Sequence, residues 1–193
     1  MNWNTQDEYI EGTHKNFNIK EKIAAFDLDN TLICPSSNNK FPINSTDWKF
    51  VFSNPSKKLK ELIKDNYCIV IISNQAGISK GKVDQDDWIQ KINNIQKHLD
   101  VPIKVYASKG NNVYRKPYPT IWNKLEEQID VKRDKSFYCG DACGRKGDHS
   151  DTDYKFALNL GIKFLLPEVL FEDKIAPDII KPTHPCENYE LPV

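Results

Sequence analysis

Short apolar runs alternate with amphipathic segments along most of the chain. Five runs have the length of a buried strand, at residues 23–26, 68–72, 101–107, 136–140 and 162–165. Between them, apolar residues recur at helical spacing after Asn54, Asp84, Pro119 and Asp151. Strands that alternate with helices form parallel sheets covered on both faces. The pattern predicts an α/β fold, a single Rossmann-like three-layer domain with a mostly parallel sheet.

The last helices of this pattern are bounded by prolines and a glycine. The helix after Pro119 carries apolar residues at helical spacing as far as Ile129, and the helix at residues 151–159 ends before Gly161, a typical C-cap. From residue 167 onward, scattered prolines and little periodicity predict a tail that wraps the surface.

We expect one domain with an appendage at each end. Residues 1–20 form an N-terminal extension, residues 21–171 the α/β domain, and residues 172–193 a C-terminal tail packed on it. The segment between residues 73 and 116 is filled by one helix and one strand, which leaves no room for a large cap domain. The aromatic-rich residues 41–52 form either a short flap over the mouth of a site or an edge hairpin of the core.

The charge of the chain gives no global field that would attract a polyanion. Its 193 residues carry 27 acidic and 27 basic side chains, so a nucleic acid would have to be met by a local patch. Only three arginines accompany a large excess of lysine. Arginine at positions 115 and 145 is then a candidate for roles that need its fork geometry.

The sequence favours an intracellular location, in the cytoplasm or nucleus. No segment approaches the apolar length of a membrane span, and the first residues have neither a signal-peptide core nor an Arg-rich amphipathic face. Five cysteines at irregular spacing argue against a disulfide framework. Cys139, Cys143 and His149 could form a zinc cluster, but no fourth ligand is evident.

Polar residues stand where the predicted strands end. Ligands of open α/β sheets bind beyond the carboxyl ends of the strands, so we expect these side chains to converge on one edge. They are Asp27, Asp29, Ser73, Asn74, Lys116 and Asp141.

Asp27 and Asp29 carry the strongest chemical signal in this set. Two places apart on an extended chain, they can project to the same side. Two carboxylates beside an apolar run repel each other unless a metal or a proton compensates them. One interpretation is a nucleophile and an acid that share a bound Mg²⁺. The other is an Asx-rich turn after an ordinary core strand.

The order of these residues resembles that of the haloacid dehalogenase superfamily of phosphotransferases. Its DxDxT motif is DLDNT here, and its later motifs correspond to Ser73, Lys116 and the acid of GDACGR. The resemblance implies that Asp27 attacks the phosphoryl group and forms an aspartyl-phosphate, while Asp29 acts as acid and then as base. It also implies Mg²⁺ between Asp27, the carbonyl of Asp29 and Asp141, with Ser73 on the phosphoryl oxygens and Lys116 balancing the charge of the nucleophile.

A closer resemblance extends over residues 23–171, to the phosphatase domain of polynucleotide kinase/phosphatase. It is carried by FPxxxxDW from residue 41, SNQAGISKGK from residue 73, YRKP from residue 114, GDACGR from residue 140 and DHSDTDYKFALNLG from residue 148. This family removes 3′-phosphates from broken DNA, which implies a role in DNA strand-break repair and DNA 3′-phosphate ends as the partner.

Some positions depart from the family pattern or stay open. Asn30 stands where Gly is common and Ser73 where Thr is common, and both keep the turn capacity or the hydroxyl that the motif needs. Asp148 and Asp153 could serve the outer coordination sphere of the metal. The alternative is that Asp148, Ser150 or Asp151 caps a helix.

Three functional hypotheses remain open at this point. The favoured one is a DNA 3′-phosphatase without kinase activity, because GISKGKV from residue 77 lacks the spacing and the hydroxyl of the kinase motif GxxxxGK followed by Ser or Thr. The second is a small-molecule phosphatase of the sugar or histidinol phosphate type, although residues 104–114 lack the Cys/His zinc loop usual there. The third is a non-catalytic module that binds DNA ends.

The cations that would hold DNA are predicted in loops that follow the carboxyl ends of strands. We nominate Arg115, Lys80, Lys82 and Arg145, together with Asn74, as substrate-binding residues. The alternatives are that Arg115 pairs with a surface acid and that Arg145 braces its own loop. We expect a monomer, and the sequence predicts no particular repair protein as a partner.

Overall fold

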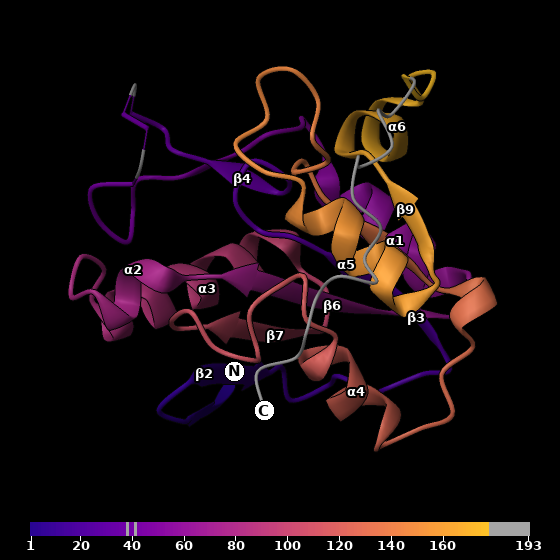
Figure 1. Ribbon diagram of the computed structural model, residues 1–193, viewed down its shortest axis with the longest axis horizontal. Coiled ribbons are helices and arrows are strands. Elements are labelled where there is room, and N and C mark those ends of the chain that lie inside the picture. Colours follow the sequence, from indigo (N-terminus) through magenta and orange to yellow (C-terminus); the bar gives the residue numbers. More distant parts are fainter. Residues whose placement is uncertain (38, 41, 178–193) are drawn as a thin grey trace.

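The computed structural model describes residues 1–37, 39–40 and 42–177, and a seven-stranded sheet forms its centre (Figure 1). The strand order is β1-β2-β7-β6-β3-β8-β9, and the five strands from β7 to β9 pair in parallel. The strands are β1 (Asn2–Thr5), β2 (Tyr9–Thr13), β3 (Lys22–Phe26), β6 (Tyr67–Asn74), β7 (Ile103–Ser108), β8 (Phe137–Cys139) and β9 (Lys163–Leu165). The predicted mostly parallel sheet is confirmed.

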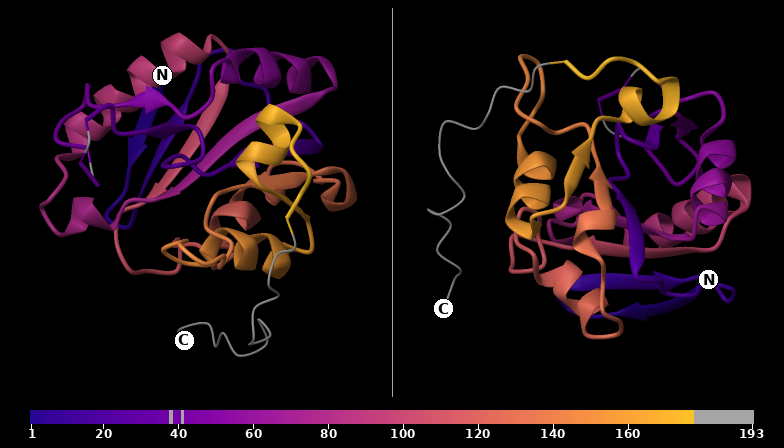
Figure 2. Two further views of the ribbon diagram at one scale, coloured as in Figure 1. Left: turned by 90° about the horizontal axis from the view of Figure 1, so that it is seen from above. Right: turned by 90° about the vertical axis from the view of Figure 1, so that its right-hand side faces the viewer.

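Helices cover both faces of this sheet (Figure 2). One face packs on α1 and α3, and the other packs on α4 and α5. The helices are α1 (Pro55–Lys64), α2 (Ala76–Ser79), α3 (Gln85–Leu99), α4 (Thr120–Glu126), α5 (Thr152–Leu160) and α6 (Pro167–Glu172), with a 3-10 turn at Arg133–Lys135. The three-layer α/β domain that the sequence predicted is therefore present.

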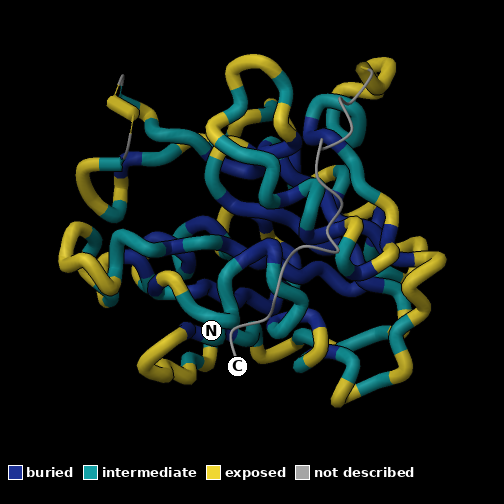
Figure 3. Tube along the Cα trace, viewed as in Figure 1, coloured by how far each residue is buried: buried dark blue, intermediate teal, exposed yellow. Residues whose placement is uncertain are grey.

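Strand β6 shows why an apolar run predicts a strand in this fold. Residues 68–73 are all buried (Figure 3). Their side chains alternate between the two faces of the sheet. Ile69 and Ile71 join the core under α1 and α3, whereas Val70 and Ile72 join the core under α4 and α5. A parallel strand covered on both sides needs such a continuous apolar run.

The first thirteen residues contain strands that the sequence did not predict. Strand β2 pairs antiparallel with β7, and β1 pairs antiparallel with β2 at the edge of the sheet. Ile10 is fully buried. The ring of Trp3 lies over Gly12, where a Cβ atom would come within 2.4 Å of it, so only glycine fits beneath the indole. The N-terminal extension is thus the antiparallel end of the same sheet.

Local capping agrees with the prediction at several helix ends. The Asp84 side chain accepts a hydrogen bond from the amide of Asp87, and Gly161 ends α5 with φ at 65°. The prediction that the helix after Pro119 reaches Ile129 is wrong, because α4 ends at Glu126 and the chain turns there. After this turn the chain returns to the sheet, where the Lys132 backbone amide donates to the Glu21 carbonyl at 2.8 Å.

The segment after β9 contains a helix that the sequence did not predict. Helix α6 begins with Pro167 in its first turn, and its residues Leu170 and Phe171 pack against the core beside α1 and α3. Phe171 stacks on Phe52 at 4.9 Å between ring centroids. The prediction of a surface-wrapping tail extends into residues 178–193, which lie outside the described residues.

A small two-stranded sheet lies apart from the main one (Figure 1). Strand β4 (Ile33–Cys34) pairs antiparallel with β5 (Lys49–Phe50), so the hairpin predicted over residues 41–52 begins earlier in the chain. Position 41, the first of that prediction, lies outside the described residues. Between residues 73 and 116 the chain forms only α2, α3 and β7, so the predicted absence of a large cap domain agrees with the structure.

Two further expectations concern membranes and cysteines. Within the described residues, every helix is too short or too polar to cross a membrane. Cys34, Cys68, Cys139 and Cys143 are free thiols. Cys186 lies outside the described residues.

Candidate active site

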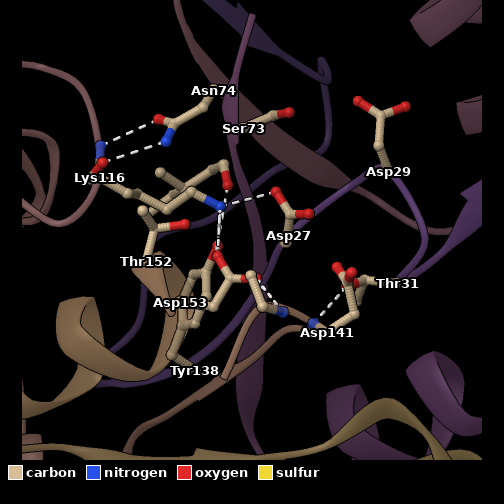
Figure 4. A network of polar contacts seen from close by, with 12 residues as sticks. Asp27, Asp29, Thr31, Ser73, Asn74, Lys116, Tyr138, Asp141, Thr152 and Asp153 are labelled. Carbon is tan, nitrogen blue, oxygen red and sulfur yellow. Dashed lines mark hydrogen bonds and ion pairs between the residues drawn. The ribbon is translucent and has the colours of Figure 1, made fainter. Parts of the chain in front are cut away.

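The carboxyl ends of β3, β6 and β8 bring the predicted polar residues together. Asp27 directly follows β3, Ser73 and Asn74 end β6, and Asp141 comes two residues after β8. The Asp27 amide donates to the Cys139 carbonyl at 2.8 Å, which extends the pairing of β3 and β8 up to the site. The convergence that the strand ends predicted is present (Figure 4).

Lys116 lies at the centre of a buried ionic network. Its ammonium group donates to Asp27 Oδ1 at 2.7 Å, to Asp153 Oδ1 at 2.8 Å and to the Tyr138 hydroxyl at 2.6 Å. The side chain is 2% exposed. Burial favours the neutral amine, but Asp153 and Asp27 outweigh it and raise the Lys116 pKa, so the side chain stays a cation.

The loop that carries Lys116 is held by Asn74. The side-chain amide of Asn74 donates to the backbone carbonyl of Lys116 at 3.1 Å. Its side-chain oxygen accepts from the backbone amide of Lys116 at 2.9 Å. This pair of bonds aligns the lysine backbone with the end of β6. In this geometry Asn74 serves the frame of the site, whereas the sequence had suggested contact with substrate.

Asp153 and Tyr138 are network members whose place the sequence did not define. Asp153, in the first turn of α5, is 1% exposed, and its Oδ2 accepts from the Ala142 amide at 3.1 Å. A Cβ atom at position 140 would lie 2.4 Å from Asp153 Oδ2, so the approach of α5 requires Gly140. Tyr138 donates to the Ile72 carbonyl at 3.0 Å. A tyrosine within an apolar strand is usually a core residue, so the sequence does not indicate that Tyr138 bonds Lys116.

Three carboxylates near Lys116 leave the site with an excess of negative charge. Asp27, Asp141 and Asp153 each offer an oxygen within 4.8 Å of the others. Burial raises the pKa of Asp27 well above its usual range, Lys116 opposes that rise, and Asp153 and Asp141 add to it. Burial and then Asp153 raise the pKa of Asp141 to about 6. One ammonium group does not neutralise the cluster.

A hard divalent cation fits this cluster. All of its donors are oxygens, which Mg²⁺ prefers as ligands. A cation would oppose both the burial and the repulsion that raise the carboxyl pKa values. The alternative zinc cluster finds no support in the described part of the chain, because Cys139 is buried in the core and Cys143 donates to Asp148. The residues present therefore suit Mg²⁺.

The opposite wall of the site consists of Asp29, Ser73 and Gln75. The Gln75 side-chain amide donates to Asp29 Oδ2 at 2.7 Å and to Ser73 Oγ at 2.8 Å. The Ser73 side chain is buried at the end of β6. The local sequence around Gln75 does not indicate this role, because its contacts depend on how β6 and the turn after β3 meet.

The turn after β3 is shaped by Asn30 and Thr31. Asn30 has a φ of 61°, in the left-handed region that Gly and Asn adopt most easily, so an asparagine suits this position of the turn. The Thr31 hydroxyl accepts from the Asp141 amide at 3.1 Å and donates to Asp141 Oδ1 at 3.2 Å. The carboxylate of Asp141 is thereby oriented toward the cluster.

The predicted DNA-binding cations lie in three different environments. Arg145 pairs with Asp148 and Glu168 and donates to the Asp141 carbonyl at 3.1 Å, which favours the bracing alternative. Asp148 also accepts from the Cys143 and Arg145 amides, so it caps its own loop.

Arg115, Lys80 and Lys82 are the other predicted cations. Lys80 and Lys82 are exposed in the loop after α2. Arg115 is half-buried beside Lys116, and its Nη1 is a buried donor without a hydrogen-bond partner in the described structure. Burial lowers the Arg115 pKa. An unpaired buried guanidinium nitrogen is costly, so an acceptor from a ligand would stabilise it.

The fold and the buried Asp–Lys site agree with the sequence resemblance to phosphatases of the haloacid dehalogenase type. The chain matches the family model "Polynucleotide kinase 3 phosphatase" over residues 22–171, and it belongs to that family. It is 38% identical over 192 residues to a "Bifunctional polynucleotide phosphatase/kinase" of Schizosaccharomyces pombe, which covers 98% of this chain and 47% of that protein. The chain thus spans about half the length of this relative.

A second relative is closer in length to this chain. It is a "Polynucleotide 3'-phosphatase" of Saccharomyces cerevisiae, 30% identical over 206 residues, with 77% of this chain and 87% of that protein covered. Among solved structures, a D,D-heptose bisphosphate phosphatase of B. bronchiseptica, complexed with magnesium and phosphate, superposes with a TM-score of 0.62 at 16% identity, over 82% of this chain and 89% of that one. This likeness shows the fold.

The raised pKa of Asp141 predicts a pH-dependent effect of Mg²⁺ on stability. In the metal-free protein the carboxyl prefers its proton, so stability is lost as the pH rises through about 6 and the group ionises among like charges. A cation removes this cost. The rise in unfolding temperature caused by Mg²⁺ should therefore be larger at about pH 7.5 than at about pH 5.

Thermal unfolding with and without Mg²⁺ at the two pH values checks this prediction. Asp141→Asn should lose most of the pH dependence, whereas Asp134→Asn, at an exposed carboxylate away from the cluster, should keep it. Equal stabilisation by Mg²⁺ at both pH values in the wild-type protein would argue against metal binding by Asp141.

Proposed function

We propose that this protein is a polynucleotide 3′-phosphatase that removes the phosphate from DNA 3′ ends through an aspartyl-phosphate on Asp27. One observation carries the proposal most directly. Asp27, the residue at the nucleophile position, is 9% exposed and bonded at 2.7 Å to a buried lysine, in a chain that matches the family model over residues 22–171. A carboxylate fixed by an ion pair to a buried lysine is a nucleophile oriented for attack.

The side chains divide the work of the first step between them. Asp27 attacks phosphorus through a carboxylate oxygen, and the bond from phosphorus to the 3′ oxygen breaks. Asp29 gives its proton to that leaving oxygen. Ser73 donates to a phosphoryl oxygen, and the Lys116 ammonium favours the ionised form of Asp27 against the effect of burial.

The second step returns the protein to its starting state. Water attacks phosphorus, its proton passes to Asp29, and the bond from phosphorus to Asp27 breaks. Mg²⁺, held by Asp27, the Asp29 carbonyl and Asp141, would offset the charge of the phosphate as it approaches the carboxylates. Asp153 and Tyr138 hold Lys116 in place throughout.

Several features support a DNA end over a small phosphate ester as the substrate. The described segment between residues 73 and 116 contains only core elements, so no large cap domain encloses the site. The Saccharomyces cerevisiae relative is by its name a polynucleotide 3′-phosphatase. The heptose bisphosphate phosphatase resembles this chain in fold alone, at 16% identity. An intact network around Lys116 also favours an enzyme over a non-catalytic DNA-end module.

The proposal extends to the setting in which the protein acts. DNA 3′-phosphate ends are its partner in strand-break repair, and it works as a monomer in the cytoplasm or nucleus. The chain lacks the kinase motif GxxxxGK followed by Ser or Thr, so the proposal is limited to phosphatase activity. Arg115, Lys80 and Lys82 are the proposed contacts to the DNA backbone, and Arg145 braces the loop of Asp141.

A phosphate-release panel tests this function. We expect the protein with Mg²⁺ to release phosphate from a 3′-phosphorylated oligonucleotide much faster than from a 5′-phosphorylated one or from sugar phosphates. Asp27→Asn, which keeps the shape of the side chain and removes its charge, should abolish release and keep the fold. A preference for sugar phosphates would establish the small-molecule alternative, and no release from any substrate would favour the binding module.

Arg115→Ala should separate polymer recognition from chemistry. Only a polymer presents a second phosphate that the unpaired Nη1 could bind, so oligonucleotide turnover should fall by about 10-fold or more, and turnover of a small aryl phosphate should change little. Steady-state kinetics on both substrates measure this difference. Arg133→Ala, which removes an arginine paired with Glu126, is the matched control. Equal losses on both substrates would place Arg115 in the catalytic centre.

A further inference from the structure

The side chain of Gln75 links the two groups that flank the nucleophile. Its amide nitrogen donates to Asp29 Oδ2 at 2.7 Å and to Ser73 Oγ at 2.8 Å, which uses both of its N–H bonds. In both contacts the Gln75 side-chain nitrogen is the donor, so Asp29 Oδ2 and Ser73 Oγ act as acceptors toward it. One side chain thus holds the proposed acid and the proposed phosphate-binding hydroxyl together.

Gln75 is itself held firmly by the backbone around it. The backbone amide of Gln75 donates to the Ser108 carbonyl at 2.8 Å, and the backbone carbonyl of Gln75 accepts from the Ile78 amide at 3.0 Å. The residue is 9% exposed and stands where β6 passes into α2. The backbone of Gln75 is therefore fixed at the edge of the sheet. Its side chain can hold Asp29 and Ser73 in defined positions.

We propose that Gln75 is a positioning residue that sets the orientation of Asp29 and Ser73 for both steps of phosphoryl transfer, an inference that rests on the proposed function. Because Ser73 Oγ accepts from Gln75, the proton of the hydroxyl is directed away from Gln75 and toward a phosphoryl oxygen. Because Gln75 holds Oδ2 of Asp29, Oδ1 is the oxygen that carries the transferred proton.

The two walls of the site are oriented by separate networks. Figure 4 shows the carboxylate of Asp29 apart from the Lys116 network, on the side toward which the Ser73 hydroxyl points. Lys116 bonds Asp27 and Asp153, and Gln75 bonds Asp29 and Ser73. Removing the Gln75 amide should therefore disturb proton transfer and leave the nucleophile in place.

Two substrates with different leaving groups separate this role from a structural one. An oligonucleotide 3′ oxygen is a poor leaving group and needs a proton as the bond to phosphorus breaks, whereas p-nitrophenolate leaves without one. Asp29 is still needed with the aryl ester, to take the proton of the attacking water in the second step. A misplaced Asp29 therefore slows the first step for DNA and the second step for the aryl ester.

Gln75→Met, nearly equal in length and without donors, is the test variant. We expect oligonucleotide turnover to fall by about 100-fold, as is typical of a misplaced catalytic group. With p-nitrophenyl phosphate, we expect a burst of p-nitrophenol close to the enzyme concentration, followed by a slow steady rate. Gln75→Glu, which replaces the two N–H donors by an acceptor, should show the same kinetics as Gln75→Met. The control Gln90→Leu, on the exposed side of α3, should show wild-type kinetics.

The outcomes separate this inference from the proposed function. Equal losses on both substrates without a burst, or unchanged kinetics in both Gln75 variants, would overturn the positioning role while wild-type activity and an inactive Asp27→Asn still supported the phosphatase. Absence of wild-type turnover on both substrates would overturn both. Should Gln75→Met fail to fold, the kinetics of Gln75→Glu decide.

Discussion

The pairing of the buried Lys116 ammonium with Asp27 and Asp153 is the interaction on which the rest of the site depends. An unpaired charge inside a protein is too costly to persist, so each of these groups requires the others. The sheet order makes the pairing possible, because β3 lies between β6 and β8 and delivers Asp27 to the middle of the edge. Gly140 lets α5 bring Asp153 close, and Asn74 fixes the backbone of Lys116.

The same network explains why the site calls for a cation. Lys116 carries one positive charge among Asp27, Asp141 and Asp153, and burial together with the neighbouring carboxylates raises the pKa of Asp27 and of Asp141. A phosphate ester would add further negative charge. A hard divalent ion, which prefers oxygen ligands, would balance the remaining negative charge.

The central strands and most of the site residues could be predicted from the sequence, because their local signals are strong. Buried parallel strands need continuous apolar runs, so the sequence predicts β3, β6 and β7. Because ligands bind at the carboxyl ends of such strands, Asp27, Ser73 and Asp141 were predicted to lie in one site.

Other elements carry weaker local signals, and the sequence did not predict them. The edge strand β1 is short and largely exposed, so it needs few apolar residues, and α6 is too short to show a helical period. The positions of Gln75 and Tyr138 follow from tertiary contacts between separate elements, which no local pattern encodes.

The most direct test of the account is to trap phosphate on Asp27. Asp29→Asn should still allow Asp27 to attack p-nitrophenyl phosphate, but it removes the base that activates water in the second step. Acid quenching followed by peptide mass spectrometry should find one phosphoryl group on the peptide that contains Asp27. Release of p-nitrophenol in a single turnover without any phosphorylated peptide would contradict the covalent mechanism.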